Sequence, residues 1–185
     1  MPEHALMRRY TYDDLALFPE DNLRRELIDG ELIVSPAPRL RHQAVAGEML
    51  YALMTWVREH GGKAYTAPVD VKFSDVTVLE PDVLFVRAEH ADRLTEKYVE
   101  GAPDVVVEVS APSTRHLELM RKRSVYERYG VAEYWYVDLE VDRVEVHRLH
   151  DGVYPAPRVL QPGDILESPE VPGFSLSVKE LLAAS

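Results

Sequence analysis

A run of four valines interrupted by one glutamate constrains this chain more than any other stretch. Val105, Val106, Val107 and Val109 surround Glu108. β-branched residues packed this closely predict a strand that is buried on both faces. An ionised carboxylate inside such a strand is costly unless a metal ion, a cation or a set of hydrogen bonds compensates it. Glu108 is therefore either one half of a structural pair with an arginine or a member of a chemical site.

The segment that follows this strand predicts a helix with a lysine on its inward side. Ser113 or Thr114 can cap the start of the helix, and Gly130 is a usual residue just beyond a helix end. Lys122 shares a face with the apolar residues that follow it at spacings of three, four and seven, namely Val125, Tyr126 and Tyr129. An isolated lysine there usually extends its ammonium to solvent. Because this helix directly follows the strand of Glu108, the ammonium and the carboxylate can converge.

A third charged residue opens another buried strand. Pro81 and Asp82 precede the apolar segment 83–86. Asp104 also follows a proline at a strand start, but it would lie about 13 Å from Glu108 along one strand, too far to share a cation. We therefore choose Asp82 as the partner of Glu108.

Two carboxylates and a lysine are a recurrent arrangement for phosphodiester hydrolysis. Asp82 and Glu108 can hold a hard divalent cation, Mg²⁺ or Mn²⁺, through oxygen. The cation polarises the phosphate and lowers the pKa of a bound water, and Lys122 orients that water or offsets developing charge.

Several motifs along the chain carry a family resemblance. They are ELIDGELIVSPAP (26–38), RHQ (41–43), PDVLFV (81–86), PDVVVEVSAPST (103–114) and GVAEYWYVD (130–138). With the spacing from Lys122 to Tyr126, this ordered set resembles the Uma-two family of restriction-endonuclease-like proteins in the PD-(D/E)XK nuclease superfamily. In that family the lysine has moved from the strand to the next helix, and here Ser110 stands at the strand position. The resemblance implies the fold and metal dependence but no defined substrate. Glu118 departs from the family, which more often has Asp there.

The residues 24–34 predict a β-hairpin that supplies one further acid. Asp29-Gly30 is a strong tight-turn dipeptide between apolar pairs. Glu26 and Glu31 are the acids of the two strands, and an exposed position is the commoner outcome for either. We expect Glu31 to join the catalytic group, because the loop after its strand leads directly to His42.

Two basic residues are candidates for contact with substrate. His42 begins a helix that runs from about Arg41 to His60, where it can meet a phosphate or a metal; the alternative is a core or capping histidine. Arg115 belongs to a basic cluster at the start of the helix that carries Lys122.

The overall charge opposes nucleic-acid binding, whereas these local clusters favour it. The net charge of −11 should repel a polyanion. A basic mouth on an acidic body and a set of solvated helix faces both fit the sequence, so two alternatives to a DNA endonuclease stay open. One is an inactive nucleic-acid-binding or assembly module of the same fold. The other is a metal-dependent hydrolase of small phosphate esters.

The length and composition predict a single domain over residues 1–185. There is no cysteine for disulfides or thiolate metal sites. No N-terminal stretch has the basic-then-apolar pattern of a signal peptide, and no apolar run approaches membrane-spanning length. We expect a cytoplasmic protein that forms a homodimer. The order of elements predicts an α/β sandwich with a mixed central β-sheet flanked by helices. Besides those above, the expected elements are a helix over 11–18, strands over 63–73, 77–86, 133–139, 143–149 and 153–160, and a helix over 177–184.

Overall fold

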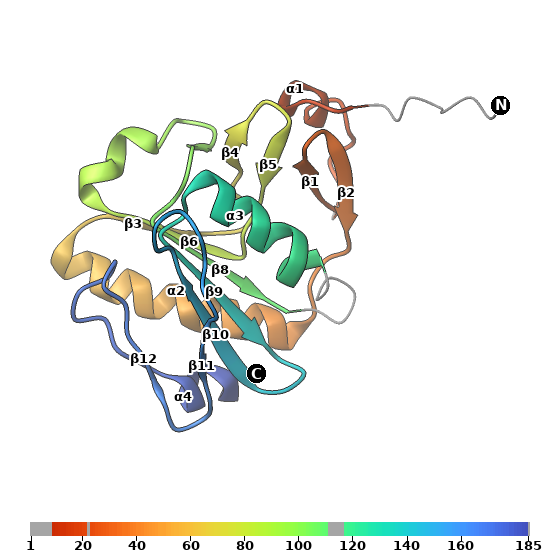
Figure 1. The fold of residues 1–185 in the computed structure, drawn as a ribbon. Helices are drawn as coiled ribbons and strands as arrows, with labels where there is room; N and C mark the ends of the chain where they lie inside the picture. The colour runs from red at the N-terminus through yellow and green to blue at the C-terminus, as the bar shows by residue number, and fades with distance from the viewer. Residues whose placement is uncertain (1–8, 22, 111–116, 185) are drawn as a thin grey trace.

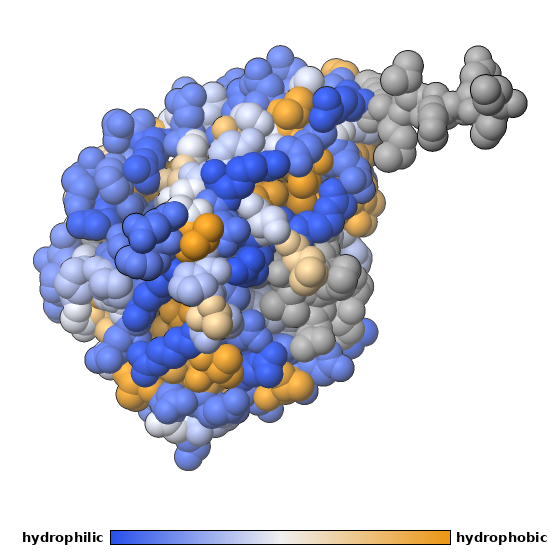
Figure 2. All heavy atoms as spheres, in the orientation of Figure 1, coloured by the Kyte–Doolittle hydropathy of each residue, from blue (hydrophilic) through white to orange (hydrophobic). Residues whose placement is uncertain are grey.

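The computed structural model describes residues 9–21, 23–110 and 117–184. These residues form a mixed α/β fold in which helices cover both faces of a central sheet (Figure 1). The cap residues Ser113 and Thr114 lie outside the described residues. No helix in the described ranges is long and apolar enough to cross a membrane. The face drawn in Figure 2 is mostly hydrophilic, with scattered hydrophobic patches.

The central sheet has six strands in the order β11-β10-β9-β8-β6-β3. Their bounds are β3 Lys63–Thr66, β6 Val83–Val86, β8 Val105–Val109, β9 Glu133–Asp138, β10 Arg143–Arg148 and β11 Arg158–Leu160. The pair β8–β9 is parallel and the other neighbours are antiparallel, so the sheet is mixed, as predicted. A parallel pair needs a crossover connection. Here the crossover contains the helical segment that carries Lys122.

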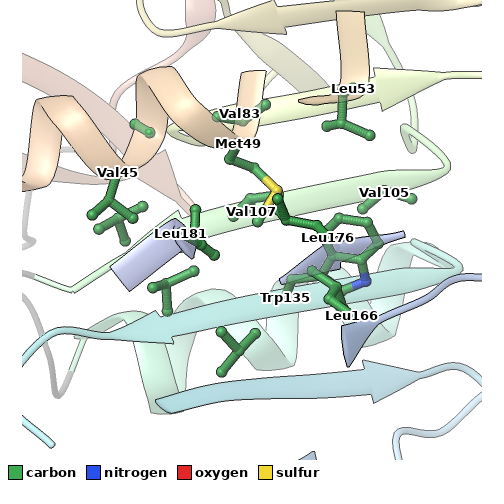
Figure 3. Close-up of a cluster of buried hydrophobic side chains, with 14 of the residues drawn as sticks. Val45, Met49, Leu53, Val83, Val105, Val107, Trp135, Leu166, Leu176 and Leu181 are labelled. Carbon is green, nitrogen blue, oxygen red and sulfur yellow. The ribbon is translucent and has the colours of Figure 1, made fainter. Parts of the chain in front are cut away.

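Helix α2 (Leu40–His60) covers one face of this sheet. Its side chains Val45, Met49 and Leu53 pack over Val83 and Val107 in the main hydrophobic core (Figure 3). Full burial of each large apolar side chain contributes roughly 1.5–3 kcal/mol. Helix α4 (Val178–Ala183) joins this core, and the side chain of Ser177 caps it by accepting the N–H of Glu180.

The other face of the sheet is covered by a π-helical turn, η2 (Leu117–Lys122), and by α3 (Arg123–Tyr129). Gly130 ends α3 in the left-handed conformation, where a glycine has no Cβ to clash. Val125 and Tyr126 are buried on this face, in a second core with residues of β6, β8 and β9. The strand β8 therefore lies between two cores, as the valine run predicts.

A second sheet of five strands has the order β2-β1-β5-β4-β7. Its strands are β1 Arg24–Ile28, β2 Glu31–Ser35, β4 Val71–Ser74, β5 Thr77–Leu79 and β7 Val99–Glu100. The hairpin β1–β2 turns at Asp29 and Gly30, which both have positive φ, as a tight hairpin requires. The chain passes from β5 in this sheet to β6 in the central sheet through residues 80–82. Asp82 thus lies where the two sheets adjoin.

Several predicted elements are shorter in the structure. The strands expected over 63–73 and 77–86 are each divided between the two sheets, near Pro68 and Pro81. Proline has no N–H for a strand ladder, so it favours such interruptions. The first helix, α1, spans only Tyr12–Leu15. The remaining short elements are η1 Ala88–Arg93, β12 Ile165–Leu166 and β13 Leu176–Ser177.

Candidate active site

Lys122 and Glu108 meet in the interior, on the side of the sheet that η2 and α3 cover. The Lys122 Nζ donates to Glu108 Oε1 at 3.0 Å. Tyr126, one helical turn after Lys122, donates its hydroxyl to the same oxygen at 2.5 Å. The lysine is 1% exposed and the glutamate 0%. The other oxygen, Glu108 Oε2, is buried without a hydrogen-bond partner among the described residues.

Glu26 holds the lysine from the opposite side. Its Oε1 lies 2.9 Å from Lys122 Nζ and accepts the backbone N–H of Glu80 at 2.8 Å. Glu26 is 1% exposed. The ammonium therefore bridges two buried carboxylates, one from the hairpin and one from the central sheet. Such a lysine stays in place because both acids would be left uncompensated without it.

Asp82 has three hydrogen-bonding partners around its carboxylate. Arg24 Nη2 donates to Oδ1 at 2.7 Å. His42 Nε2 lies 3.0 Å from Oδ2, which also accepts the N–H of Val109 at 2.7 Å. Burial alone would raise the pKa of Asp82, but the His42 hydrogen bond and the charge of Arg24 outweigh it and lower the pKa to about 2. Asp82 is therefore ionised at neutral pH.

The pKa of Glu108 is shifted in the opposite direction from that of Asp82. Burial raises the pKa of Glu108 to about 7; Lys122 opposes this rise, while Asp82 and Glu26 add to it. Neighbouring acids whose pKa values are pushed apart are typical of acid–base and metal sites. We call Arg24, Glu26, His42, Asp82, Glu108, Lys122 and Tyr126 the buried polar cluster.

The residues of the cluster fit a hard divalent cation with few protein ligands. Among the described residues, no group of three or more His, Cys, Asp or Glu side chains is arranged to hold a metal ion. Mg²⁺ does not need such a group, since it commonly keeps several waters and binds one or two carboxylates. The unpartnered Glu108 Oε2 and the adjacent ionised Asp82 supply that smaller set.

The expectation that Glu31 joins these residues in preference to Glu26 is wrong. The Glu31 side chain is 52% exposed and forms an ion pair with Arg121 at 2.8 Å. Glu31 and Glu26 do share one face of the hairpin, because Glu31 lies opposite Ile28 and Glu26 lies opposite Ile33. Glu31 is at the turn, however, about 7 Å further along the hairpin than Glu26.

The two candidates for contact with substrate, His42 and Arg115, have different outcomes. His42 is 7% exposed and joins the cluster through Asp82. Its Nδ1 is buried with no hydrogen-bond partner in the described part of the chain. Arg115 lies outside the described residues, as does the side chain of Glu118. The cluster also contains Arg24, Glu26 and Tyr126, which the sequence interpretation did not select. The alternation of Arg24 with Glu26 and the four-residue spacing from Lys122 to Tyr126 were the available signals.

Comparisons with known proteins give one family match and one similar fold. Residues 10–179 match the model of the Uma2 family, described as "Putative restriction endonuclease". The fold is similar to a crystal structure from Anabaena variabilis ATCC 29413, titled as a "putative nuclease belonging to DUF820". That chain is 21% identical, the TM-score is 0.78, and the match covers 94% of this chain and 97% of the other. No curated protein matches.

Proposed function

The chain belongs to the Uma2 family, as its motifs indicate, and from this premise we propose that it is a metal-dependent endonuclease that hydrolyses DNA phosphodiester bonds. The observation that carries the proposal is the burial of Asp82, Glu108 and Lys122 within reach of one another's charges: Lys122 pairs with Glu108, and Asp82 interacts electrostatically with both. These three residues come from a strand start, a central strand and a helix. Chemistry that needs two carboxylates and an ammonium explains their meeting better than stability does, because buried ion pairs are costly to desolvate.

Asp82 and Glu108 are the residues that would hold Mg²⁺ or Mn²⁺. When bound, the cation supplies Lewis-acid polarisation of the phosphate and a bound water of lowered pKa. Lys122 orients the attacking water and offsets the charge that develops on the phosphate. Tyr126 and Lys122 both hold Glu108 Oε1, which leaves Oε2 for other contacts.

The remaining members of the cluster position these groups. Glu26 keeps Lys122 near Glu108, and its hydrogen bond from Glu80 N–H fixes the carboxylate on the hairpin. His42 and the Val109 N–H hold Asp82 Oδ2, so His42 acts on the acid first and on any substrate through it. Such a supporting shell is what keeps catalytic groups within productive geometry.

A hydrolase of small phosphate esters remains the second candidate, because one observation favours it. The net charge of −11 opposes a long polyanion more than it opposes a small ester. Under either function the buried polar cluster performs the same hydrolysis.

The test incubates wild-type protein with supercoiled plasmid in Mg²⁺, in Mn²⁺ and in EDTA. We expect nicked and linear products with either metal and none with EDTA, and no products from Glu108→Gln. Parallel assays with bis(p-nitrophenyl) phosphate and p-nitrophenyl phosphate separate the substrate classes. Turnover of the small esters alone would favour the second candidate. Binding of DNA without cleavage in either metal would favour an inactive module.

A further inference from the structure

Arg24 is the member of the buried polar cluster that lies nearest to solvent. Its side chain is 17% exposed, whereas those of Asp82, Glu26, Glu108 and Lys122 are 1% exposed or less. Arg24 and Glu26 lie on the same face of β1, so one strand supplies the guanidinium that contacts Asp82 and the carboxylate that contacts Lys122. The Arg24 guanidinium is thus the group that an incoming molecule can reach.

The oxygens of the two acids are not equally occupied. An ionised carboxylate can accept about four hydrogen bonds. Asp82 Oδ2 has two partners, His42 and Val109 N–H, and Oδ1 has Arg24. Glu108 Oε1 also has two partners, Lys122 and Tyr126. The oxygens that can still accept a ligand are therefore Glu108 Oε2 and Asp82 Oδ1. Arg24 therefore stands at the Asp82 oxygen that a cation needs.

The guanidinium of Arg24 has donors to spare. Of its five N–H groups, one hydrogen bond is formed within the described residues, from Nη2 to Asp82. A planar fork with free donors at the solvent boundary is suited to the paired oxygens of a phosphate.

The charges of the cluster lead to the same ligand. Three carboxylates and two cationic side chains give a formal charge of −1 when all are ionised and His42 is neutral. A divalent cation changes this charge to +1, and one phosphodiester monoanion then brings it to zero. Once the cation is bound, Asp82 no longer needs the charge of Arg24, and the incoming phosphate does need a positively charged partner.

We propose that Arg24 occupies Asp82 Oδ1 in place of the divalent cation, gives up this oxygen when the cation binds, and then binds the substrate phosphate. This inference rests on the proposed function, and it assigns the phosphate-binding residue of that site. Asp82 keeps its orientation through the exchange, because His42 and the Val109 N–H hold its other oxygen.

The experiment measures Mn²⁺ affinity by isothermal titration calorimetry for wild type, Arg24→Gln, Arg24→Lys and Arg25→Gln. Arg25 is the matched control, because it is the next residue on β1 and its side chain pairs with Asp21 instead. We expect Arg24→Gln to bind Mn²⁺ about tenfold more tightly than wild type, since a hydrogen-bonded charge competing for the ligand has been removed. Arg24→Lys keeps the charge and should stay near wild type, as should Arg25→Gln.

The second arm measures binding of a short DNA duplex in Mn²⁺ by fluorescence anisotropy, in a Lys122→Met background in which cleavage is slowed. Adding Arg24→Gln should weaken DNA binding about tenfold, and Arg25→Gln should change it little. Circular dichroism confirms folding of each variant, and Arg24→Lys provides a second test if Arg24→Gln unfolds: it should lose DNA affinity because it lacks the fork.

The outcomes separate the two proposals. If wild type binds Mn²⁺ and Arg24→Gln binds it equally or less tightly, Arg24 is a structural clamp and the inference fails while the proposed function stands. If neither protein binds Mn²⁺, both fail.

Discussion

The hairpin β1–β2 contacts the helical segment η2–α3 through two kinds of ion pair. Glu26 meets Lys122 where both side chains are 1% exposed. Asp29 meets Arg128 at the same distance, 2.9 Å, but with side chains 52% and 48% exposed. The hairpin lies beside α3 at one end of the molecule (Figure 1). The two pairs have similar chemistry and the same distance between their charged groups, so they differ mainly in their exposure to solvent.

The difference in exposure gives the two ion pairs different expected roles, one in the buried polar cluster and one at the surface. Exposed ion pairs contribute about 0–1 kcal/mol, because water screens them and two long side chains lose freedom. A buried pair is costly to desolvate, and removal of one partner leaves an uncompensated charge. The buried pair should thus control chemistry and stability strongly, and the exposed pair should control neither.

The largest expected effect is on turnover. Lys122→Met keeps most of the apolar stem and removes the ammonium, so the cleavage rate should fall on the order of a hundredfold or more. Metal affinity should change far less, because Asp82 and Glu108 remain. Arg128→Met removes a cation from the same helical segment, η2–α3, and should leave the rate near wild type. Single-turnover rates and Mn²⁺ titrations measure both quantities, and an unchanged rate for Lys122→Met would remove the ammonium from the mechanism.

The next effect is on stability. Glu26→Ala removes one of the two buried carboxylates that hold Lys122 in the described part of the chain, and it leaves the Glu80 N–H without its acceptor. The free energy of unfolding should therefore fall by about 3–5 kcal/mol. Glu31→Ala, the matched change on the other strand, should cost about 1 kcal/mol or less. Urea denaturation in the presence of EDTA gives both values. Equal losses for the two variants would contradict the distinction between the buried and exposed pairs.

These two glutamates also mark how far the sequence alone leads. The valine run, the proline before Asp82 and the helical spacing of Lys122 predict where the central residues lie, because each rests on local periodicity. The choice between Glu26 and Glu31 depends on how far along the hairpin the second sheet meets the first. Periodicity within a strand determines the face of a residue and leaves its position against another sheet undetermined. The division of 63–73 and 77–86 between two sheets was missed for the same reason.

Arg24 and Tyr126 illustrate a second limit. An arginine on a strand and a tyrosine on an apolar helical stripe each have an ordinary explanation in the sequence. Their roles are defined by which oxygen each one contacts, Asp82 Oδ1 and Glu108 Oε1. These contacts join residues far apart in the chain, so tertiary structure is needed to find them.

The pH dependence of stability should have opposite signs in the two regions. Burial raises the pKa of Glu108 to about 7 from its ordinary value of 4.5, so its protonated form favours folding. This contribution is fully present below pH 4.5 and is lost as the pH rises through 7. Glu108→Gln mimics the protonated acid. Its free energy of unfolding relative to that of wild type should therefore rise by about 3 kcal/mol between pH 4.5 and 7. Urea denaturation of both proteins across this range in EDTA checks the sign, and a constant difference would contradict it.

The smallest effect belongs to the exposed pair of Asp29 and Arg128. The Arg128 hydrogen bond lowers the pKa of Asp29 below its ordinary value of 3.8, and its ionised form therefore favours folding. That contribution is present above pH 3.8 and is lost as the pH falls through the lowered pKa, the reverse of Glu108.

A double-mutant cycle of Asp29→Asn and Arg128→Met at pH 7 should give a coupling energy of about 0–1 kcal/mol. Raising the salt from 0.1 M to about 1 M should reduce this coupling, because the screening length shortens to about 3 Å. The cycle of Glu26→Gln and Lys122→Met should keep its larger coupling in the same salt, since water and ions do not reach a pair that is 1% exposed. If salt weakened both couplings equally, burial would not be what distinguishes the two pairs.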